Sequence, residues 1–284
     1  MIAFQLEVKA LLKIKSREHL VKLLTTYEHQ NHYHLMFRWA EGGNLADLWK
    51  KHVRKPILDH GRICWFAEQC HGLAHGLDGI HDTKLSQKEV EDIQGSPSST
   101  PSIKSASRTQ YLSVKQDGVN ANKFRDGDCG RHGDIKPENI LWFSQDQNRF
   151  RHGELKISDF GLTTFHSMLT TKVSPKGIAV THTYMAPEHD LNEDLSRPFD
   201  IWSLGCTYLE FITWMILGAD GLKKFSALRL QETGSRKTFY CDNFYKIIRE
   251  GKSTRAEVKE SVEKVSNSPT PMSPHTGMMA DLVL

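Results

Sequence analysis

The sequence has 284 residues and a formal net charge of +3 at pH 7. The basic residues are scattered along the chain, so the charge pattern gives no indication of a nucleic-acid partner. The hydrophobic fraction of 38% is ordinary for a soluble protein with some disordered content, and the length allows one large domain or two small ones. Five cysteines without a Cys-x-x-Cys pair favour reduced thiols and an intracellular protein, cytoplasmic or nuclear.

The apolar pattern predicts no membrane partner. The first twelve residues carry Glu7 and Lys9 within an amphipathic pattern, which argues against a signal peptide. The longest apolar run, Leu204–Gly218, is interrupted by Glu210 and is short for a helix that crosses a bilayer. We expect this run to form a buried helix of the core.

The first 45 residues predict a helix, a strand pair and a turn into a second helix. Two apolar runs, 19–24 and 33–37, flank a polar turn around Gln30-Asn31 and predict antiparallel strands. Gly42-Gly43-Asn44 is typical of a strand-to-helix turn. Four apolar residues before the strands recur on one helix face and predict an amphipathic helix: Phe4, Val8, Leu11 and Leu12.

A long helix is predicted over Arg62–His81, because its apolar residues repeat with helical period. His71 and His75 lie one turn apart on it, as in some zinc sites. No third ligand occurs at a suitable spacing, so we interpret them as ordinary helix histidines.

A segment from about 84 to 130 follows this helix and contains few large apolar residues. Its run of serines and prolines at 95–102 cannot bury enough surface to offset chain entropy, so we expect a disordered insertion. Ser96 and Thr100 each precede a proline, which leaves a phosphorylated regulatory loop open. A tolerated surface insertion is the interpretation that we favour.

Two polar stretches carry the chemistry, 132–141 (HGDIKPENIL) and 155–161 (LKISDFG). In-line transfer of a phosphoryl group needs a carboxylate that orients and deprotonates the attacking hydroxyl, metal ligands, and a cation near the developing charge. Asp134 fits the base, Lys136 the cation, and Asn139 and Asp159 the metal ligands. Either stretch alone could be a polar loop between two strands. Together and in this order they closely resemble the catalytic loop and the Asp-Phe-Gly segment of eukaryotic protein kinases.

The resemblance implies roles for residues before the catalytic loop. Glu7 corresponds to the helix glutamate that pairs with a lysine of the small lobe, although a solvated helix charge remains open. Phe37 would lie at the back of the adenine pocket, and the backbone near Ala40 would bond the adenine edge. Leu141 would lie under the adenine ring.

Further matches follow the Asp-Phe-Gly segment. Residues 162–184 correspond to the activation segment, in which Thr181 would bridge Asp134 and Lys136. Ala186-Pro187-Glu188 matches the end of that segment. Phe199-Asp200-Ile201-Trp202 resembles the start of the central helix of the large lobe, where Asp200 would hold the backbone of the catalytic loop.

The sequence departs from the family pattern in several places. No Gly-x-Gly-x-x-Gly loop occurs, and no candidate for the phosphate-binding lysine precedes Glu7. Gly133 replaces an arginine that usually receives an activation-loop phosphate. No arginine partner for Glu188 is identifiable. After Gly218 the resemblance weakens, and we expect a helix within 242–251 and 254–265, a Ser/Pro linker at 267–274 and a helix at 278–284.

These observations predict an α+β, two-lobed protein-kinase-like fold with an incomplete small lobe and a mainly helical large lobe. The implied function is a serine/threonine protein kinase that uses ATP and Mg²⁺ on protein hydroxyls; Lys136 favours serine/threonine over tyrosine. A pseudokinase scaffold, or an inactive part of a longer kinase, remains open, and oligomeric state is not indicated. The expected divisions are 1–40 (partial small lobe), 41–83 (hinge and first large-lobe helices), 84–130 (insertion) and 131–284 (remaining large lobe, truncated at its C-terminal end).

Overall fold

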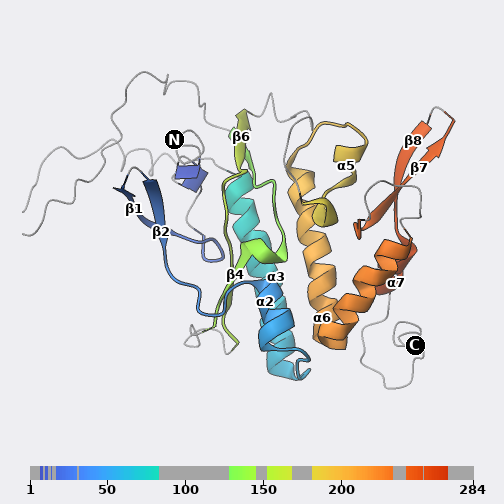
Figure 1. Ribbon diagram of the computed structural model, residues 1–284, viewed down its shortest axis with the longest axis horizontal. Coiled ribbons are helices and arrows are strands. Elements are labelled where there is room, and N and C mark those ends of the chain that lie inside the picture. The colour runs from blue at the N-terminus through green and yellow to red at the C-terminus, as the bar shows by residue number, and fades with distance from the viewer. Residues whose placement is uncertain are drawn as a thin grey trace, which may run out of the picture.

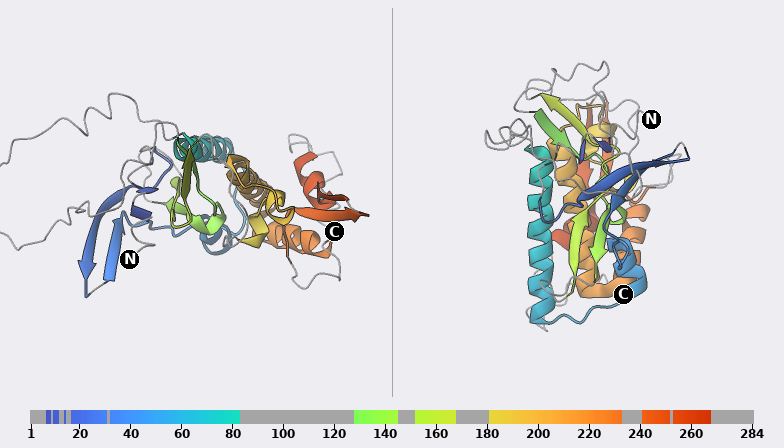
Figure 2. Two further views of the ribbon diagram at one scale, coloured as in Figure 1. Left: turned by 90° about the horizontal axis from the view of Figure 1, so that it is seen from above. Right: turned by 90° about the vertical axis from the view of Figure 1, so that its left-hand side faces the viewer.

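The computed structural model describes residues 7–8, 10–11, 14, 17–30, 32–82, 128–144, 152–167, 181–232, 241–251 and 253–267. A β-hairpin lies at one end of the molecule, beside a larger and mostly helical body (Figure 1). A second hairpin lies at the opposite end of that body, as the view from above shows (Figure 2). The α+β, two-lobed arrangement expected from the sequence is therefore confirmed.

The small lobe as described contains only the first hairpin and a short helical segment that includes Glu7 and Val8. The elements of the whole chain, in order, are β1 (Leu23–His29), β2 (His32–Phe37), α2 (Leu45–Asp47), the π-helical turn η1 (Leu48–His52), α3 (His60–His81), β3 (Asp128–Arg131), the 3₁₀ turn η3 (Pro137–Asn139), β4 (Ile140–Phe143), β5 (Glu154–Ile157), β6 (Thr164–Ser167), the 3₁₀ turn η4 (His182–Tyr184), α5 (Pro187–Asp190), α6 (Arg197–Gln231), β7 (Tyr245–Glu250), β8 (Ser253–Val258) and α7 (Glu260–Asn267).

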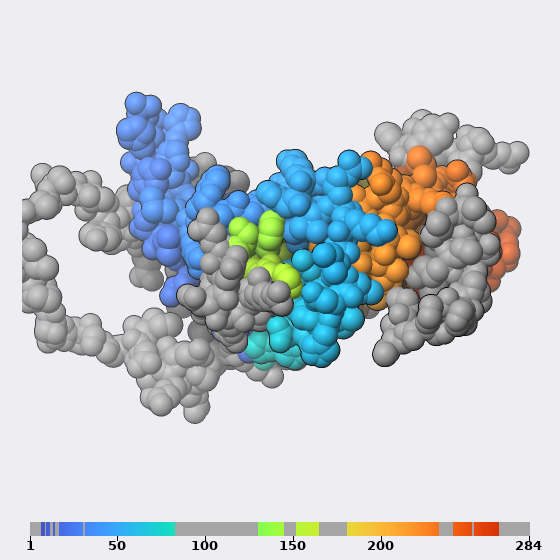
Figure 3. Space-filling model, turned by 90° about the horizontal axis from the view of Figure 1, so that it is seen from below, coloured from blue at the N-terminus to red at the C-terminus, as the bar shows by residue number. Residues whose placement is uncertain are grey.

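The first hairpin pairs β1 with β2, and His29 faces His32 across the turn. The predicted bounds of its first strand, 19–24, are wrong. Leu20 instead forms a parallel bridge to Ile157, and the amide N–H of Val21 donates to the Ile157 carbonyl at 3.0 Å. Leu20 is 5% exposed. Burial of this side chain against the large lobe is therefore more favourable than extending the hairpin strand back to residue 19. In the view from below, the hairpin extends sideways from the body, at the upper left of the picture (Figure 3).

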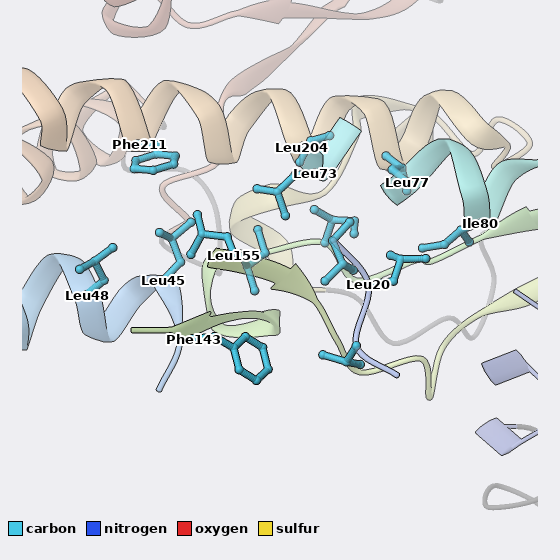
Figure 4. Close-up of a cluster of buried hydrophobic side chains, with 14 of the residues drawn as sticks. Leu20, Leu45, Leu48, Leu73, Leu77, Ile80, Phe143, Leu155, Leu204 and Phe211 are labelled. Atoms are coloured by element: carbon cyan, nitrogen blue, oxygen red, sulfur yellow. The ribbon is translucent and has the colours of Figure 1, made fainter. Parts of the chain in front are cut away.

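The core of the large lobe lies between α3, α6 and the β4–β5 hairpin. Side chains from all of these elements converge there (Figure 4). Leu73 on α3, Leu155 on β5 and Phe211 on α6 have no exposed surface. Helix α3 begins at His60, two residues before the predicted start, because the Asp59 carboxylate accepts the Arg62 amide at 2.7 Å and caps the helix.

Helix α6 is the long apolar helix of the body, and it confirms the buried helix expected at 204–218. By length and composition it is the one helix among the described residues that could cross a membrane, but 56% of its most apolar window is buried in the protein. Its axis bends at Gly218, which has φ +75°. A Cβ there would lie 2.6 Å from the Arg54 carbonyl, so the bend requires glycine.

The predicted helix over 242–251 is wrong, as is its continuation through the first part of 254–265. Residues 245–250 and 253–258 form the antiparallel pair β7–β8, joined at Gly251, which has φ +59°. Tyr245 is buried, and it lies 5.9 Å from Trp202 between ring centroids, so an aromatic contact anchors the first strand. A helix, α7, does form over Glu260–Asn267, within the second half of the predicted range.

Several predictions fall outside the described residues. They concern Phe4 and Leu12 in the first helix, most of the Ser/Pro linker and the helix at 278–284. Most of the predicted insertion also falls outside, including Ser96 and Thr100. Its last residues, 128–130, belong to β3, which pairs with β6. The insertion therefore ends before residue 128.

Candidate active site

The loop at 132–136 is held by one buried carboxylate. Asp200 lies in the first turn of α6 and has no exposed surface. Its Oδ2 accepts the amide of His132 and its Oδ1 accepts the amide of Gly133, each at 2.8 Å. The Nε2–H of His81, at the end of α3, donates to Oδ2 at the same distance. This carboxylate therefore links α3, the loop and α6, and it is also stabilised by the helix N-terminus.

His132 fixes the loop from its other side. Its Nε2–H donates to the Ser158 carbonyl at 3.0 Å, and its Nδ1 accepts the Asp134 amide at 3.3 Å. Its ring lies 5.4 Å from that of Phe160, which is 1% exposed. Burial lowers the pKa of His132, so the imidazole is neutral, in agreement with this donor and acceptor pattern.

Asp134 is the centre of a compact polar cluster. The Lys136 ammonium donates to its Oδ2 at 2.7 Å, and the Asn139 amide donates to the same oxygen at 3.0 Å. The Thr181 hydroxyl donates to Oδ1 at 2.8 Å and accepts from Lys136 at 2.9 Å. The side chain of Asp134 is 11% exposed and that of Lys136 is 20% exposed, so both still reach solvent. The structure thus brings together Asp134, Lys136, Asn139 and Thr181.

Asn139 and Asp159 fit the requirements of a magnesium site. The amide and hydroxyl of Ser158 both donate to the Asn139 carbonyl, at 2.8 and 2.9 Å, which places Asp159 beside Asn139. Asp159 has φ +64°, and its Oδ1 accepts a long bond of 3.3 Å from the Gly161 amide. A carboxylate and an amide oxygen are ligands that Mg²⁺ accepts, with the remainder supplied by water and phosphate. No group of three or more His, Cys, Asp or Glu suited to a metal occurs among the described residues.

Glu7 faces the same region from the small lobe. Its side chain is partly buried, and burial raises the pKa of Glu7, with a further contribution from the negative charge of Asp159. No ion pair to Glu7 is found within the part of the chain that the structure describes. The lysine that the resemblance implies for it is therefore not among the described residues.

The three residues expected at the adenine end lie along the junction of the lobes. Phe37 ends β2 and packs against the main core, as do Ala40 and Leu141. The Ala40 carbonyl accepts the Gly43 amide at 3.1 Å in the predicted turn. Leu141 bridges to Asn44, whose side chain caps α2. Their roles toward adenine remain predictions.

A buried charge network under the end of the activation segment was not predicted from the sequence. Arg229 of α6 has no exposed surface and donates to Glu210 at 2.7 Å and to the Asp242 carbonyl at 2.8 Å. Its guanidinium lies 4.1 Å from each of the two ring centroids of Phe225 and Phe244. The Tyr184 hydroxyl donates to the other Glu210 oxygen at 2.7 Å, so the network reaches the activation segment.

Glu188, unlike the residues of this charge network, has a buried carboxylate oxygen for which no partner is found in the described part of the chain. The residue lies in the short helix α5, and the oxygen is Oε2. The arginine partner that could not be identified in the sequence is not found in that part of the structure either.

A cavity of about 690 Å³ opens next to the Asp134 cluster. Lys136, Asn139 and Thr181 form part of its wall, together with residues of α2, η1 and α6. A polypeptide that enters the cavity would therefore reach the Asp134 cluster.

Gly133, which replaces the family arginine, has φ +86°. Replacing it with alanine is expected to lower the free energy of unfolding by about 1–2 kcal/mol, because a Cβ is strained in this conformation. The added Cβ would also lie 3.3 Å from the Leu162 carbonyl. Urea unfolding measures the change. Gly205→Ala is the control, because that helical glycine has no atom within 4 Å of an added Cβ, and alanine there should stabilise. Equal effects of the two substitutions would contradict the prediction.

Comparisons with known proteins agree with this geometry. The family model described as protein kinase domain matches residues 129–265. Mouse cyclin-dependent kinase 4 is 37% identical over 87 residues, which is 31% of this chain and 25% of that protein. Cyclin-dependent kinase E-1 of Arabidopsis thaliana is 36% identical over 83 residues, 29% of this chain and 17% of that protein. A probable serine/threonine-protein kinase of Dictyostelium discoideum is 41% identical over 86 residues, 30% of this chain and 8% of that protein.

The loop held by a buried carboxylate, the Asp134 cluster and these matches all point to the protein-kinase class. Over residues 129–265, slightly less than half of its length, the chain is similar to the eukaryotic protein kinase family. The aligned region spans a quarter or less of the length of these relatives.

Proposed function

We propose that the protein transfers the γ-phosphoryl group of ATP to serine or threonine hydroxyls of a protein substrate. The observation that carries the proposal is the Asp134 cluster, in which one carboxylate is oriented by Lys136, Asn139 and Thr181 on a loop that Asp200 holds. A rigid, partly exposed carboxylate of this kind is suited to accept a proton from an incoming hydroxyl.

The residues divide the chemistry between them. A new bond forms between the substrate hydroxyl oxygen and the γ-phosphorus, the bond to the β,γ-bridging oxygen breaks, and the hydroxyl proton passes to Asp134. Lys136 lies within 2.9 Å of Thr181 and 2.7 Å of Asp134, where it can stabilise the charge on the transferring group. Mg²⁺, held through Asn139 and Asp159, would neutralise the phosphate charges.

A scaffold without catalytic activity is the second candidate function. Glu7 favours it, because this carboxylate faces Asp159 with no ion pair among the described residues. The two functions differ in whether phosphate is transferred, and not in whether the fold forms.

Magnesium-dependent nucleotide binding is the first expected result of the proposal. Titration calorimetry should detect ATP binding with Mg²⁺ and at least tenfold weaker binding without it. Asp159→Asn should remove the dependence on Mg²⁺, because an amide is a poorer magnesium ligand than a carboxylate. Asp78→Asn is the control, since Asp78 lies on α3 with a side chain that is 65% exposed.

The same preparation should phosphorylate a mixture of peptides that contain a single serine, threonine or tyrosine, with label on serine and threonine only. If neither the removal of Mg²⁺ nor Asp159→Asn changed the affinity for ATP, the magnesium site would be wrongly placed. Binding without any transfer would favour the scaffold. We also place the protein inside the cell, because Cys64, Cys70, Cys206 and Cys241 are free thiols.

A further inference from the structure

A strongly basic surface borders the cavity that leads to Lys136. Six cationic side chains from η1, the loop after it and α6 make up this surface, which we call the basic patch: Lys50, Lys51, Arg54, Lys55, Lys223 and Lys224. The two segments adjoin directly, because the Ala219 amide donates to the Arg54 carbonyl at 2.6 Å. Blue residues of the first segment lie beside orange residues of α6 in the view from below (Figure 3).

Few carboxylates neutralise the basic patch. Asp47 pairs with Lys51 at 2.7 Å, and Asp220 lies 3.4 Å from Arg54 and 3.3 Å from Lys223. The side chains of Arg54, Lys223 and Asp220 are 68%, 72% and 77% exposed, so these pairs are weak and open to exchange. For Lys50, Lys55 and Lys224, no ion pair is found in the described part of the chain. The patch therefore retains a clear positive excess.

The acidic residues deep in the same cavity are already occupied by this chain. Glu210 accepts from Arg229 and Tyr184, each at 2.7 Å. Asp242 accepts from Ser226 at 2.5 Å and from Thr183 at 2.7 Å. These two carboxylates cannot bind a basic substrate side chain without breaking buried bonds. Glu138 is the remaining carboxylate of the wall and lies on η3, at the end near the catalytic loop.

We propose that the basic patch and the cavity together select a substrate segment with acidic side chains beside its phosphoacceptor serine or threonine. Lys50 and Lys223 line the same cavity as Lys136 and Thr181, so one extended peptide can contact both ends. The acidic side chains are aspartate, glutamate or a phosphorylated residue, and they pair with lysines that lack strong partners of their own. This inference rests on the proposed function and adds a substrate class to it.

Peptide binding tests the inference without relying on catalysis. Three fluorescent peptides share one serine and carry four flanking residues that are all glutamate, all glutamine or all lysine. Fluorescence anisotropy should show at least tenfold tighter binding of the glutamate peptide than of the glutamine peptide at low salt. The difference should shrink as salt is raised, because exposed charges are screened.

Charge reversal assigns the effect to the patch. Lys50→Glu with Lys223→Glu should abolish the preference for the glutamate peptide, while Lys22→Glu with Lys264→Glu, at exposed lysines elsewhere, should retain it. Phosphorylation at low peptide concentration should show the same order of kcat/KM. Equal affinity of the unaltered protein for all three peptides would overturn the inference, as would a preference that survives the reversal.

Further measurements distinguish failure of this inference from failure of the proposed function. Selective binding without phosphate transfer would overturn the proposed function and support the inference about the patch. Transfer to all three peptides at equal rates would support the proposed function and overturn the inference about the patch. Vesicles of phosphatidylcholine with phosphatidylserine, and a single-stranded RNA, are tested in parallel. Patch-dependent binding to either of these, without discrimination between the peptides, would overturn the inference and assign the patch to a membrane or a nucleic acid.

Discussion

Asp134→Asn will reduce phosphate transfer by about 10³-fold or more while changing the unfolding free energy by less than about 1 kcal/mol. An amide cannot accept the proton of the attacking hydroxyl, and positioned general bases typically contribute 10²–10⁴-fold to rate. Stability should change little, because the cluster borders solvent and Lys136 keeps its contact with Thr181 at 2.9 Å.

A phosphate-incorporation assay and a thermal melt on the same preparations measure the two effects. Asp194→Asn provides the matched control, because Asp194 is exposed in the loop after α5 and has no part in the cluster. If Asp134→Asn transferred phosphate at the normal rate, the catalytic role of Asp134 would be wrong and the scaffold would become the better proposal. A large fall in melting temperature would show that the carboxylate also supports the fold.

Arg229→Met will have the largest effect on stability, lowering the unfolding free energy by about 3–5 kcal/mol. Removal of one partner of a buried ion pair leaves the other charge buried and uncompensated. Here that charge is Glu210, which among the described residues would keep the Tyr184 hydroxyl at 2.7 Å as its donor. The methionine also loses the contacts of the guanidinium with the rings of Phe225 and Phe244.

Combining Arg229→Met with Glu210→Gln will recover part of the loss, because the uncompensated charge is gone. Denaturant unfolding of the two single variants and the double variant gives the coupling between the residues. The single variant Glu210→Gln measures the effect on stability of replacing the carboxylate with an amide alone. Additive effects of the two substitutions would show that the ion pair contributes nothing to stability.

Acidification should also reduce the loss of unfolding free energy that Arg229→Met causes. Burial raises the pKa of Glu210 above its ordinary value of 4.5, and Arg229 opposes this shift. The native state therefore binds the proton more tightly than the unfolded state, so the stability contribution of this group falls as pH rises from 4.5 through the native pKa. Without Arg229 the native pKa rises further. The difference in unfolding free energy between the variant and the unaltered protein should therefore shrink on acidification.

Three members of the Asp134 cluster were predictable because they are close in sequence. Asp134, Lys136 and Asn139 lie within six residues of one another, so one short stretch that resembles a kinase catalytic loop contains all three. Asp200 was recognisable in the same way, through the short pattern at the start of α6. Local patterns of this kind do not depend on how distant parts of the chain meet.

Arg229 was missed because its partner Glu210 is 19 residues away on α6, beyond the bend at Gly218. A single arginine near the end of a helix is typical of a solvated residue, and no local pattern indicates that it is buried. Phe225, four positions before Arg229, was the available signal that the arginine is buried, although a phenylalanine there also fits an ordinary apolar helix face. The contacts of Arg229 with Glu210 and Phe244, which the structure shows, distinguish these cases.

The β7–β8 hairpin was mistaken for a helix for a different reason. Residues 245–250 (YKIIRE) combine β-branched, aromatic and charged side chains that suit a strand or an amphipathic helix. Gly251, followed by a lysine and a serine, was the turn signal that could have decided between them. Resemblance to a helical region favoured the wrong alternative.

The contacts of Asp200 have a consequence for the length of chain between α3 and β3. His81 and the His132 amide bind the same carboxylate oxygen, each at 2.8 Å, so the intervening 50 residues leave and return at one point. Because loop-closure entropy grows only with the logarithm of length, doubling this stretch costs about 0.6 kcal/mol. A ligand-responsive domain could be spliced in here without altering the distance between Asp134 and Asp159. Asp200 holds both ends of this stretch, so external control of the protein could be engineered at this junction.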